Sequence, residues 1–335
     1  MTDASVTMRD VYRARQRIAG IAVRTPLVKS PELTKRADAS VHLKLENVQR
    51  TGAFKIRGAA NKLRSLSSEE CARGVITVSS GNHGRAVAYV AHELGIEAII
   101  CMSTRVPANK VDSIRQLGAE VILHGETYDE AEEYAVRLEK DRGVTMIPPF
   151  DDPDVIAGQG TIGLELLEDL PDLDTVVVPL SGGGLLSGIA LTLKSADPSI
   201  RTIGVSMARA PVMVHSLRAG HPIEMEEEQT LADALAGGIG LDNRYTFRMV
   251  QEYVDETLLV TESEIADAMA FALKVHHLVV EGGGAVALAA VLHGKVRRMS
   301  GNTVIILSGG NVEIPLLLEI TRDSMDNESL QEDRR

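Results

Sequence analysis

The chain has 335 residues, 44% of them hydrophobic, which is enough apolar material for two domains or one large α/β unit. Its formal net charge of −12 argues against nucleic acid or an anionic membrane as a partner, because such binding depends on lysine and arginine side chains. With only two cysteines and an N-terminal stretch that lacks the apolar core of a signal peptide, the chain is expected in a reducing cytoplasm.

Short β-branched runs alternate with longer amphipathic stretches, a pattern typical of parallel sheets with helices on both faces. In chain order, strands are expected at residues 74–79, 98–102, 120–123, 175–179, 201–205 and 303–308. Residues 128–142 carry Ala131, Tyr134, Ala135 and Leu138 on one side and acids elsewhere, which predicts a surface helix. The apolar runs are a strand's length, too short to span a membrane.

The strands and helices fall into two series, which predict two sheets with a cleft between them, a usual place for a cofactor. We expect a large cofactor-binding domain from residues 1–50 and 149–320 and a small domain from residues 51–148. The charged tail at residues 321–335 is expected to be frayed.

A lysine motif opens the small domain. Lys55 follows Phe54, and Gly52 and Gly58 bracket the pair. A lysine that forms an imine with a cofactor must be partly desolvated, so that its pKa falls, and must lie on a rigid element. Taken alone, a lysine is usually a solvated surface charge, so neighbouring motifs have to support this role.

A glycine-rich turn follows the expected strand at residues 175–179. It consists of Ser181, Gly182, Gly183, Gly184 and Leu185. Glycines at a strand-to-helix turn let backbone N–H groups converge on an anion, aided by the helix N-terminus. The turn has neither the ending of a nucleotide P-loop nor the spacing of a dinucleotide fold. It therefore predicts a phosphate site of another kind, with a simple tight connection as the alternative.

Two polar loops complete the pattern. Ser79, Ser80, Asn82 and His83 follow a strand, where their donors can hold a substrate carboxylate and Asn82 can reach a phenolic ring oxygen. His83 is equally well explained as a structural hydrogen-bond donor. Ser308 ends the last strand, and a neutral hydroxyl on a pyridine nitrogen favours elimination over transamination. Together the four motifs predict a site for pyridoxal 5'-phosphate (PLP).

In this order the motifs resemble the threonine/serine dehydratase family of fold-type II PLP enzymes. The resemblance extends to residues 44–47, 110, 118–121, 150–152, 157–161 and 307–311. It implies two open, twisted parallel sheets like those of the tryptophan synthase β subunit, with the cofactor in the cleft. It further implies these contacts: Lys55 as the imine lysine, Phe54 on the ring, Asn82 at the ring hydroxyl, Ser181 to Leu185 at the phosphate and Ser308 at the pyridine nitrogen.

The chain departs from the family at several positions. Many dehydratases and serine racemases read Gly-Val-Glu-Pro where this chain has Ser206 and Met207, so the glutamate that can hold a divalent cation is missing and no metal site is expected. Ala53 replaces the usual serine, and residues 281–285 form a variant of the substrate-side loop. Residues 205–207, 230–233 and 237–247 look like the hydroxyectoine-utilisation dehydratase branch.

The predicted function is a PLP-dependent lyase that removes the α-proton and the β-hydroxyl of a 3-hydroxy-2-amino acid or of a hydroxyectoine-derived relative. Lys55 would serve as imine donor and base. The first alternative is an amino-acid racemase in which Ser80 protonates the opposite face, since dehydratases often carry alanine there. The second is a ligand-binding protein without catalysis, against which the lysine argues. An amino-acid substrate and a homo-oligomer, dimer or tetramer, are the expected partners.

Overall fold

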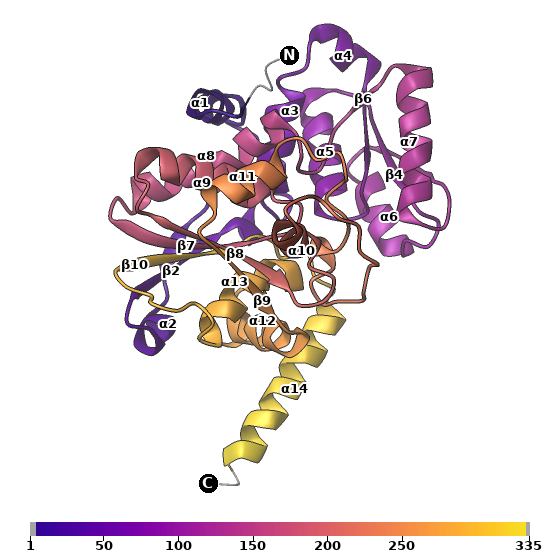
Figure 1. The fold of residues 1–335 in the computed structure, drawn as a ribbon. Helices are drawn as coiled ribbons and strands as arrows, with labels where there is room; N and C mark the ends of the chain where they lie inside the picture. Colours follow the sequence, from indigo (N-terminus) through magenta and orange to yellow (C-terminus); the bar gives the residue numbers. More distant parts are fainter. Residues whose placement is uncertain (1–4, 333–335) are drawn as a thin grey trace.

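The protein, described here by a computed structural model, is defined for residues 5–332, with side chains described to residue 324. Two sheets organise it (Figure 1). The larger has the order β1-β2-β10-β7-β8-β9, with strands Leu27–Lys29, Ser40–Leu45, Asn302–Leu307, Leu173–Pro179, Arg201–Met207 and Glu256–Val260. The smaller has the order β5-β4-β3-β6, with strands Glu120–Leu123, Ala98–Met102, Val75–Val78 and Thr145–Met146.

All six predicted strands are present, with ends shifted by two residues at most. Four further strands, β1, β2, β6 and β9, were not predicted. The sheets are parallel as predicted except at one edge, where β1 pairs with β2 antiparallel. A short chain reversal through α2 (Pro31–Arg36) joins these two strands, which permits the antiparallel pairing.

Alternate side chains of the larger sheet face opposite helical layers. On β7, Val176 and Val178 pack toward α8 (Pro153–Asp169) and α9 (Gly184–Ala196), whereas Val177 packs toward α12 (Glu262–His276) and α13 (Gly282–Leu292). Figure 1 shows these helices above and below the sheet. Because both faces are covered, each residue of such a strand can be apolar, which explains the unbroken valine run.

The smaller sheet is covered in the same way. One face packs against α3 (Lys55–Leu63), α5 (Asn82–Leu94) and α6 (Ala108–Arg115), and the other against α7 (Tyr128–Arg142). The helix predicted at residues 128–142 has these bounds, and Thr127 caps it by accepting from the Glu130 N–H.

The remaining elements connect or flank the two layered units. They are α1 (Met8–Arg17), α4 (Ser68–Arg73), α10 (Val212–Ala219), α11 (Thr246–Tyr253), α14 (Ile314–Glu332) and two 3₁₀ turns, η1 (Glu46–Val48) and η2 (Asp233–Leu235). The tail was expected to be frayed, and in the structure α14 continues through it as far as residue 332. Leu317 and Ile320 anchor the start of this helix in the core.

None of the helices within residues 5–332 is long and apolar enough to cross a membrane. The division into domains at residues 50 and 148 stays a prediction. The strand positions support it, since the smaller sheet uses residues 75–146 only.

Candidate active site

Three helices begin at residues predicted for the site. Lys55 is the first residue of α3, Asn82 of α5 and Gly184 of α9. Ser308 directly follows the last residue of β10. Helix N-termini carry partial positive charge and free N–H groups, so this arrangement suits an anionic ligand.

The segment before Lys55 lies along the end of β10. The Phe54 N–H donates to the Ser308 carbonyl at 3.0 Å, and the Gly310 N–H donates to the Gly52 carbonyl at 2.9 Å. Ala53 and Gly309 form an antiparallel bridge between these bonds. The lysine and Ser308, 253 residues apart in the chain, are therefore held together by backbone.

Lys55 is partly buried and its amine has a backbone acceptor. Nζ donates to the Pro149 carbonyl at 2.6 Å and lies 5.3 Å from the centre of the Phe54 ring. Desolvation lowers the pKa of Lys55 to about 8. A substantial neutral fraction thus exists near pH 8, and the neutral amine is the form that attacks a carbonyl.

Phe150, which follows Pro149, connects Lys55 to the glycine turn. It packs so closely on this turn that a Cβ on Gly182 would collide with the Phe150 ring, and a Cβ on Gly184 would lie 3.0 Å from the Phe150 carbonyl oxygen. Gly183 has φ +88°, and its Cβ would meet side chains of α10 and α11 at 3.0–3.2 Å. Glycine is therefore required at 182 and 184 by the close approach of Phe150, and at 183 by the left-handed backbone.

The N-terminus of α9 has no side-chain cap. Its N-cap is Gly183, and the first bond of the turn runs from the Ser187 N–H to the Gly183 carbonyl at 2.8 Å. The N–H groups before Ser187 have no acceptor within the helix, although residues 184–193 are all buried. A phosphate would satisfy them, so the residues present fit the predicted cofactor. Ser181 Oγ donates to the Leu235 carbonyl at 2.8 Å, which ties η2 to this turn.

Two aspartates after Phe150 hold the elements around the turn. Asp151 accepts the backbone N–H groups of Arg244, Tyr245 and Thr246 at 2.7–2.9 Å, which secures the start of α11. Asp152 caps α8 and pairs with Lys62 at 2.6 Å. Sequence analysis noted these residues only as part of a resemblance. An aspartate before Pro153 is a signal for a helix N-terminus that was available but unused.

Glycines also set the distance between α3, α8 and α9. A Cβ on Gly158 of α8 would lie 2.6 Å from the Arg57 carbonyl oxygen and 2.7 Å from Gly58 Cα. On the other side of α8, a Cβ on Gly188 would lie 2.6 Å from Gly160 N. These contacts fix Lys55 relative to the glycine turn, because both lie at the ends of the stacked helices.

The loop after β3 contains the predicted substrate contacts. Ser79 Oγ accepts from the Gly81 N–H at 3.3 Å, and Ser80 is partly exposed. His83 is 4% exposed, and its Nε2 lies 2.9 Å from the Ile147 carbonyl, which requires a proton on Nε2. Burial and then the nearby Lys55 charge lower the pKa of His83 to about 3, so the ring is neutral. Its role as a substrate contact stays a prediction.

Asn82 contacts a residue that sequence analysis did not assign to the site. Its Nδ2 donates to Glu281 Oε1 at 2.6 Å. Burial raises the pKa of Glu281 to about 7, although the Asn82 bond opposes this shift. Residues 282–285, expected as a loop, instead begin α13. The glycines precede the helix-forming run of residues 285–292, and the helix extends back through them. Glycine is needed there for close packing: a side chain at Gly282 would collide with the Leu231 carbonyl, and a Cβ on Gly284 would lie 2.9 Å from Gly309 N.

A buried group of four charges lies beneath α3. Arg57 Nη2 contacts Glu46 Oε1 at 2.8 Å, and its Nη1 contacts Glu165 Oε1 at 2.6 Å. Lys44 Nζ contacts Glu165 Oε2 at 2.6 Å. Burial favours neutral Glu46, but the Arg57 charge and its hydrogen bonds prevail and lower the pKa of Glu46. Two positive and two negative charges balance, and Glu165 keeps some solvent contact, which makes burial of the other three tolerable.

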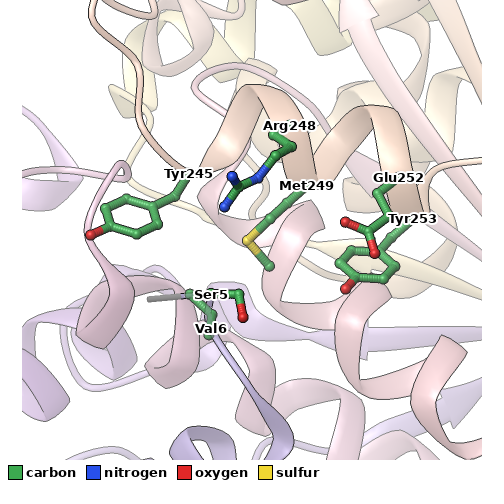
Figure 2. Close-up of a pocket in the computed structure, with 7 residues that line it drawn as sticks. All are labelled: Ser5, Val6, Tyr245, Arg248, Met249, Glu252 and Tyr253. Carbon is green, nitrogen blue, oxygen red and sulfur yellow. The ribbon is translucent and has the colours of Figure 1, made fainter. Parts of the chain in front are cut away.

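Neither of two cavities that the structure contains is lined by a predicted site residue. One, of about 250 Å³, lies between Ser5, Val6 and one face of α11 (Figure 2). Figure 2 shows Tyr245, Met249 and Tyr253 around it, whereas Thr246 and Val250 of the same helix approach Gly183. The other, of about 610 Å³, is lined by Arg24–Leu27, Lys29, His42, Asp169 and Leu170.

Ser206, the residue on which the expectation of no metal site depends, is 3% exposed, and its Oγ contacts Met207 Sδ at 3.4 Å. Within the described part of the chain there is no group of three or more His, Cys, Asp or Glu side chains arranged to hold a metal ion.

A site that only binds phosphate does not need a lysine with a lowered pKa, yet this site has both Lys55 and the uncapped N-terminus of α9. The presence of both, where strands of two open α/β sheets end, defines a PLP-dependent enzyme of fold type II. The chain belongs to the family described as "Pyridoxal-phosphate dependent enzyme", whose model matches residues 18–309.

Similar proteins indicate which class of PLP-dependent enzyme the chain belongs to. The chain is 45% identical over 312 residues to an L-threonine ammonia-lyase of Thermotoga maritima, covering 93% of this chain and 77% of the relative. It is 41% identical to the catabolic L-threonine dehydratase of Escherichia coli K12, covering 95% and 97%. Maize serine racemase has a similar structure, with TM-score 0.90, 35% identity and coverage of 97% and 100%. The predicted cofactor, fold and class, a PLP-dependent lyase of threonine dehydratase type, are confirmed.

Proposed function

We propose that the protein converts a 3-hydroxy-2-amino acid of the threonine or serine type into a 2-oxo acid and ammonia. The observation that carries this proposal is Lys55, which lies at the start of α3 with a lowered pKa and is joined by backbone to Ser308. The names of the relatives at 41–45% identity support the same reaction.

Five contacts are proposed for the cofactor. Lys55 binds it covalently, Phe54 packs on its ring, Asn82 donates to its ring oxygen, residues 181–185 hold its phosphate, and Ser308 faces its ring nitrogen. When bound, PLP withdraws electrons from the α-carbon of the substrate. Ser308 is a neutral partner that leaves the ring nitrogen largely unprotonated, which limits this withdrawal to what an elimination requires.

Lys55 Nζ is proposed to take the α-proton, because an amine with pKa near 8 is both basic and partly neutral at physiological pH. Ser79, Ser80, Asn82 and His83 are proposed to face the substrate. The uncapped N-terminus of α5 at Asn82 offers N–H groups for its carboxylate.

The test is an amino-acid panel assayed for 2-oxo acid and ammonia, with Lys55→Ala as the control. The panel includes threonine, serine, 3-hydroxyaspartate and hydroxyectoine-derived amino acids. The last group is included because residues 205–207, 230–233 and 237–247 look like the hydroxyectoine branch. Product formation with none of them, or equal product in Lys55→Ala, contradicts the proposal.

A racemase is the second candidate, favoured by Ser80 and by the similarity to maize serine racemase. If Ser80 is only a loop hydroxyl, Ser80→Ala keeps elimination of one enantiomer. If Ser80 is a second acid/base, the variant loses enantiomer inversion by roughly 10²-fold or more. Chiral chromatography that finds inversion faster than 2-oxo acid release would favour the racemase.

A homo-oligomer is proposed because Val48, Val279, Ile314 and Leu318 expose apolar side chains on η1, after α12 and on α14. Light scattering of wild type and of an Ile314→Glu/Leu318→Glu double variant tests this. A cytoplasmic location is proposed because Cys71 and Cys101 are both free.

A further inference from the structure

A carboxyl group and two side-chain amides form a hydrogen-bonded series between the two sheets. It runs from Glu281, before α13, through Asn82, at the start of α5, to Asn311, after β10. Asn82 Nδ2 donates to Glu281 Oε1, and Asn311 Nδ2 donates to Asn82 Oδ1, both at 2.6 Å. Asn82 follows β3 of the smaller sheet, whereas its two partners belong to the larger unit.

A backbone carbonyl fixes the direction of these bonds. Asn311 Nδ2 also donates to the Thr51 carbonyl at 2.9 Å, and a carbonyl can only accept, so this nitrogen is identified. Its second N–H must then meet an oxygen, which places Oδ1 of Asn82 toward Asn311 and Nδ2 toward Glu281. One N–H of Asn82 is used by Glu281, and the other is left for a ligand.

Glu281 is itself held firmly. It is 6% exposed, its N–H donates to the Gly309 carbonyl at 3.1 Å, and its carboxyl also accepts from the Asn311 backbone N–H. A side chain at Gly309 would collide with this carboxyl. The charged groups that act on it, Asp233 and Lys110, pair with each other at 3.3 Å. Asn82 and Asn311 therefore provide its hydrogen-bond donors.

We propose that Glu281 is a positioning residue that fixes the side-chain amide of Asn82, so that the free N–H of Asn82 is presented to the oxygen of the cofactor ring. The inference rests on the proposed function for the contact between Asn82 and the ring. Glu281 acts only through Asn82. Its buried carboxyl, with a pKa raised to about 7 by burial, also makes this contact sensitive to pH near neutrality.

A double-mutant cycle tests the proposal by titration of PLP into wild type, Glu281→Ala, Asn82→Ala and the double variant. Each single substitution should weaken PLP binding by roughly 10- to 100-fold, the effect of a hydrogen bond to a charged group. The double variant should bind no more weakly than Asn82→Ala. Additive losses in the double variant would overturn the proposal.

The conservative variant Glu281→Gln gives an independent test of the positioning role, which remains available if Glu281→Ala does not fold. Its carboxamide oxygen can still accept from Asn82, so PLP affinity should stay within about fivefold of wild type. The change of cofactor absorbance between pH 6 and 8 should disappear, and its persistence would overturn the proposal. Glu264→Gln, at a glutamate of α12 paired with Lys295, is the control that leaves both readouts unchanged. Failure of borohydride to fix PLP to Lys55 would instead overturn the proposed function.

Discussion

At the scale of single residues, Lys55 shows how burial sets the reactivity of an amine. Its ordinary pKa of 10.5 falls to about 8 because the side chain is desolvated, and the Pro149 carbonyl stays as its partner. His83, close enough to feel this charge, is kept neutral by its own burial. The local environment thus favours the neutral form of both groups.

Covalent attachment of PLP should become faster as the pH rises to about 8 and then level off, because only the neutral amine of Lys55 reacts. Stopped-flow absorbance measures this rate, and peptide mapping after borohydride reduction should locate the adduct on Lys55. Lys62, on the same helix but paired with Asp152, is the internal control. An adduct on Lys62 would contradict the assignment.

The same shift predicts how stability depends on pH. Between about pH 8 and 10.5 the unfolded chain binds a proton at Lys55 that the folded, cofactor-free protein does not, so the free energy of unfolding should rise with pH there. Urea unfolding at several pH values should show this slope in wild type, and Lys55→Met should lack it.

Gly183→Asp should weaken PLP binding, because it adds a side chain and a negative charge at the proposed phosphate site. The positive φ should also cost about 1–3 kcal/mol of folding stability. Gly220→Asp is the matched control, since Gly220 has φ +79° with nothing within 4 Å of its Cβ. Calorimetry should find both variants destabilised but only Gly183→Asp impaired in PLP titration. Wild-type affinity in Gly183→Asp would exclude this turn as the phosphate site.

At the scale of elements, the position of the site depends on how closely three helices approach. The α3, α8 and α9 helices contact one another through Gly58, Gly158, Gly160 and Gly188. Residues 157–161, which sequence analysis used only as part of the resemblance, therefore also have a packing role. Gly158 faces α3 and Gly160 faces α9.

Gly158→Ala should destabilise the protein by about 1–3 kcal/mol, because the added methyl would overlap the backbone of α3. It should also weaken PLP binding, since Lys55 would move away from the glycine turn. Gly238→Ala, at an exposed glycine with its nearest atom 4.0 Å from the added Cβ, should change neither quantity. Urea unfolding and PLP titration measure both, and unchanged stability in Gly158→Ala would contradict the packing argument.

The four strands that were missed differ in why the sequence hid them. Strands β1 and β6 have three and two residues, too few to show a period of two, and β9 is an edge strand. Strand β2 carries Lys44, which looks exposed by composition but is fully buried beside Glu165. Val41, Leu43 and Leu45 alternate with polar residues, so the period of two that indicates a strand was present but was not used.

At the scale of the whole molecule, the buried charges of Arg57, Glu46, Glu165 and Lys44 join α3 of the lysine motif to η1, β2 and α8. Removing one charge would leave its partners uncompensated in a largely buried site, since Lys44, Glu46 and Arg57 have fully buried side chains. This cluster therefore holds together segments 11 to 121 residues apart in the chain, from Glu46 and Arg57 to Lys44 and Glu165.

Glu46→Gln should lower the free energy of unfolding by about 3–5 kcal/mol, because Arg57 would keep only one buried counter-charge. Since the folded pKa of Glu46 lies below its ordinary 4.5, its contribution is present above that pH and is lost as the pH falls further. Glu32→Gln, at an exposed pair with Lys35, is the control, and its effect should be much smaller because water screens this pair. Equal effects of the two substitutions in urea unfolding would contradict the role of burial.

Sequence alone determined the α/β class, six strands, the helix at residues 128–142 and the order of the lysine, glycine and serine motifs. These features follow from period, turn chemistry and residue type, which act over a few neighbouring positions. Of the glycine turn, only Gly183 is required by local backbone conformation, since its φ is +88°, whereas Gly182 and Gly184 are required by the distant Phe150.

The tertiary structure alone decided which of these motifs meet and what surrounds them. The Pro149 carbonyl at Lys55, Glu281 at Asn82 and Asn311 at Asn82 are contacts across 94, 199 and 229 residues. The order of strands in the sheets creates these contacts, and that order depends on packing of whole elements against one another. The pKa of Lys55 and that of Glu281 were set in the same way, since burial is a property of the assembled fold.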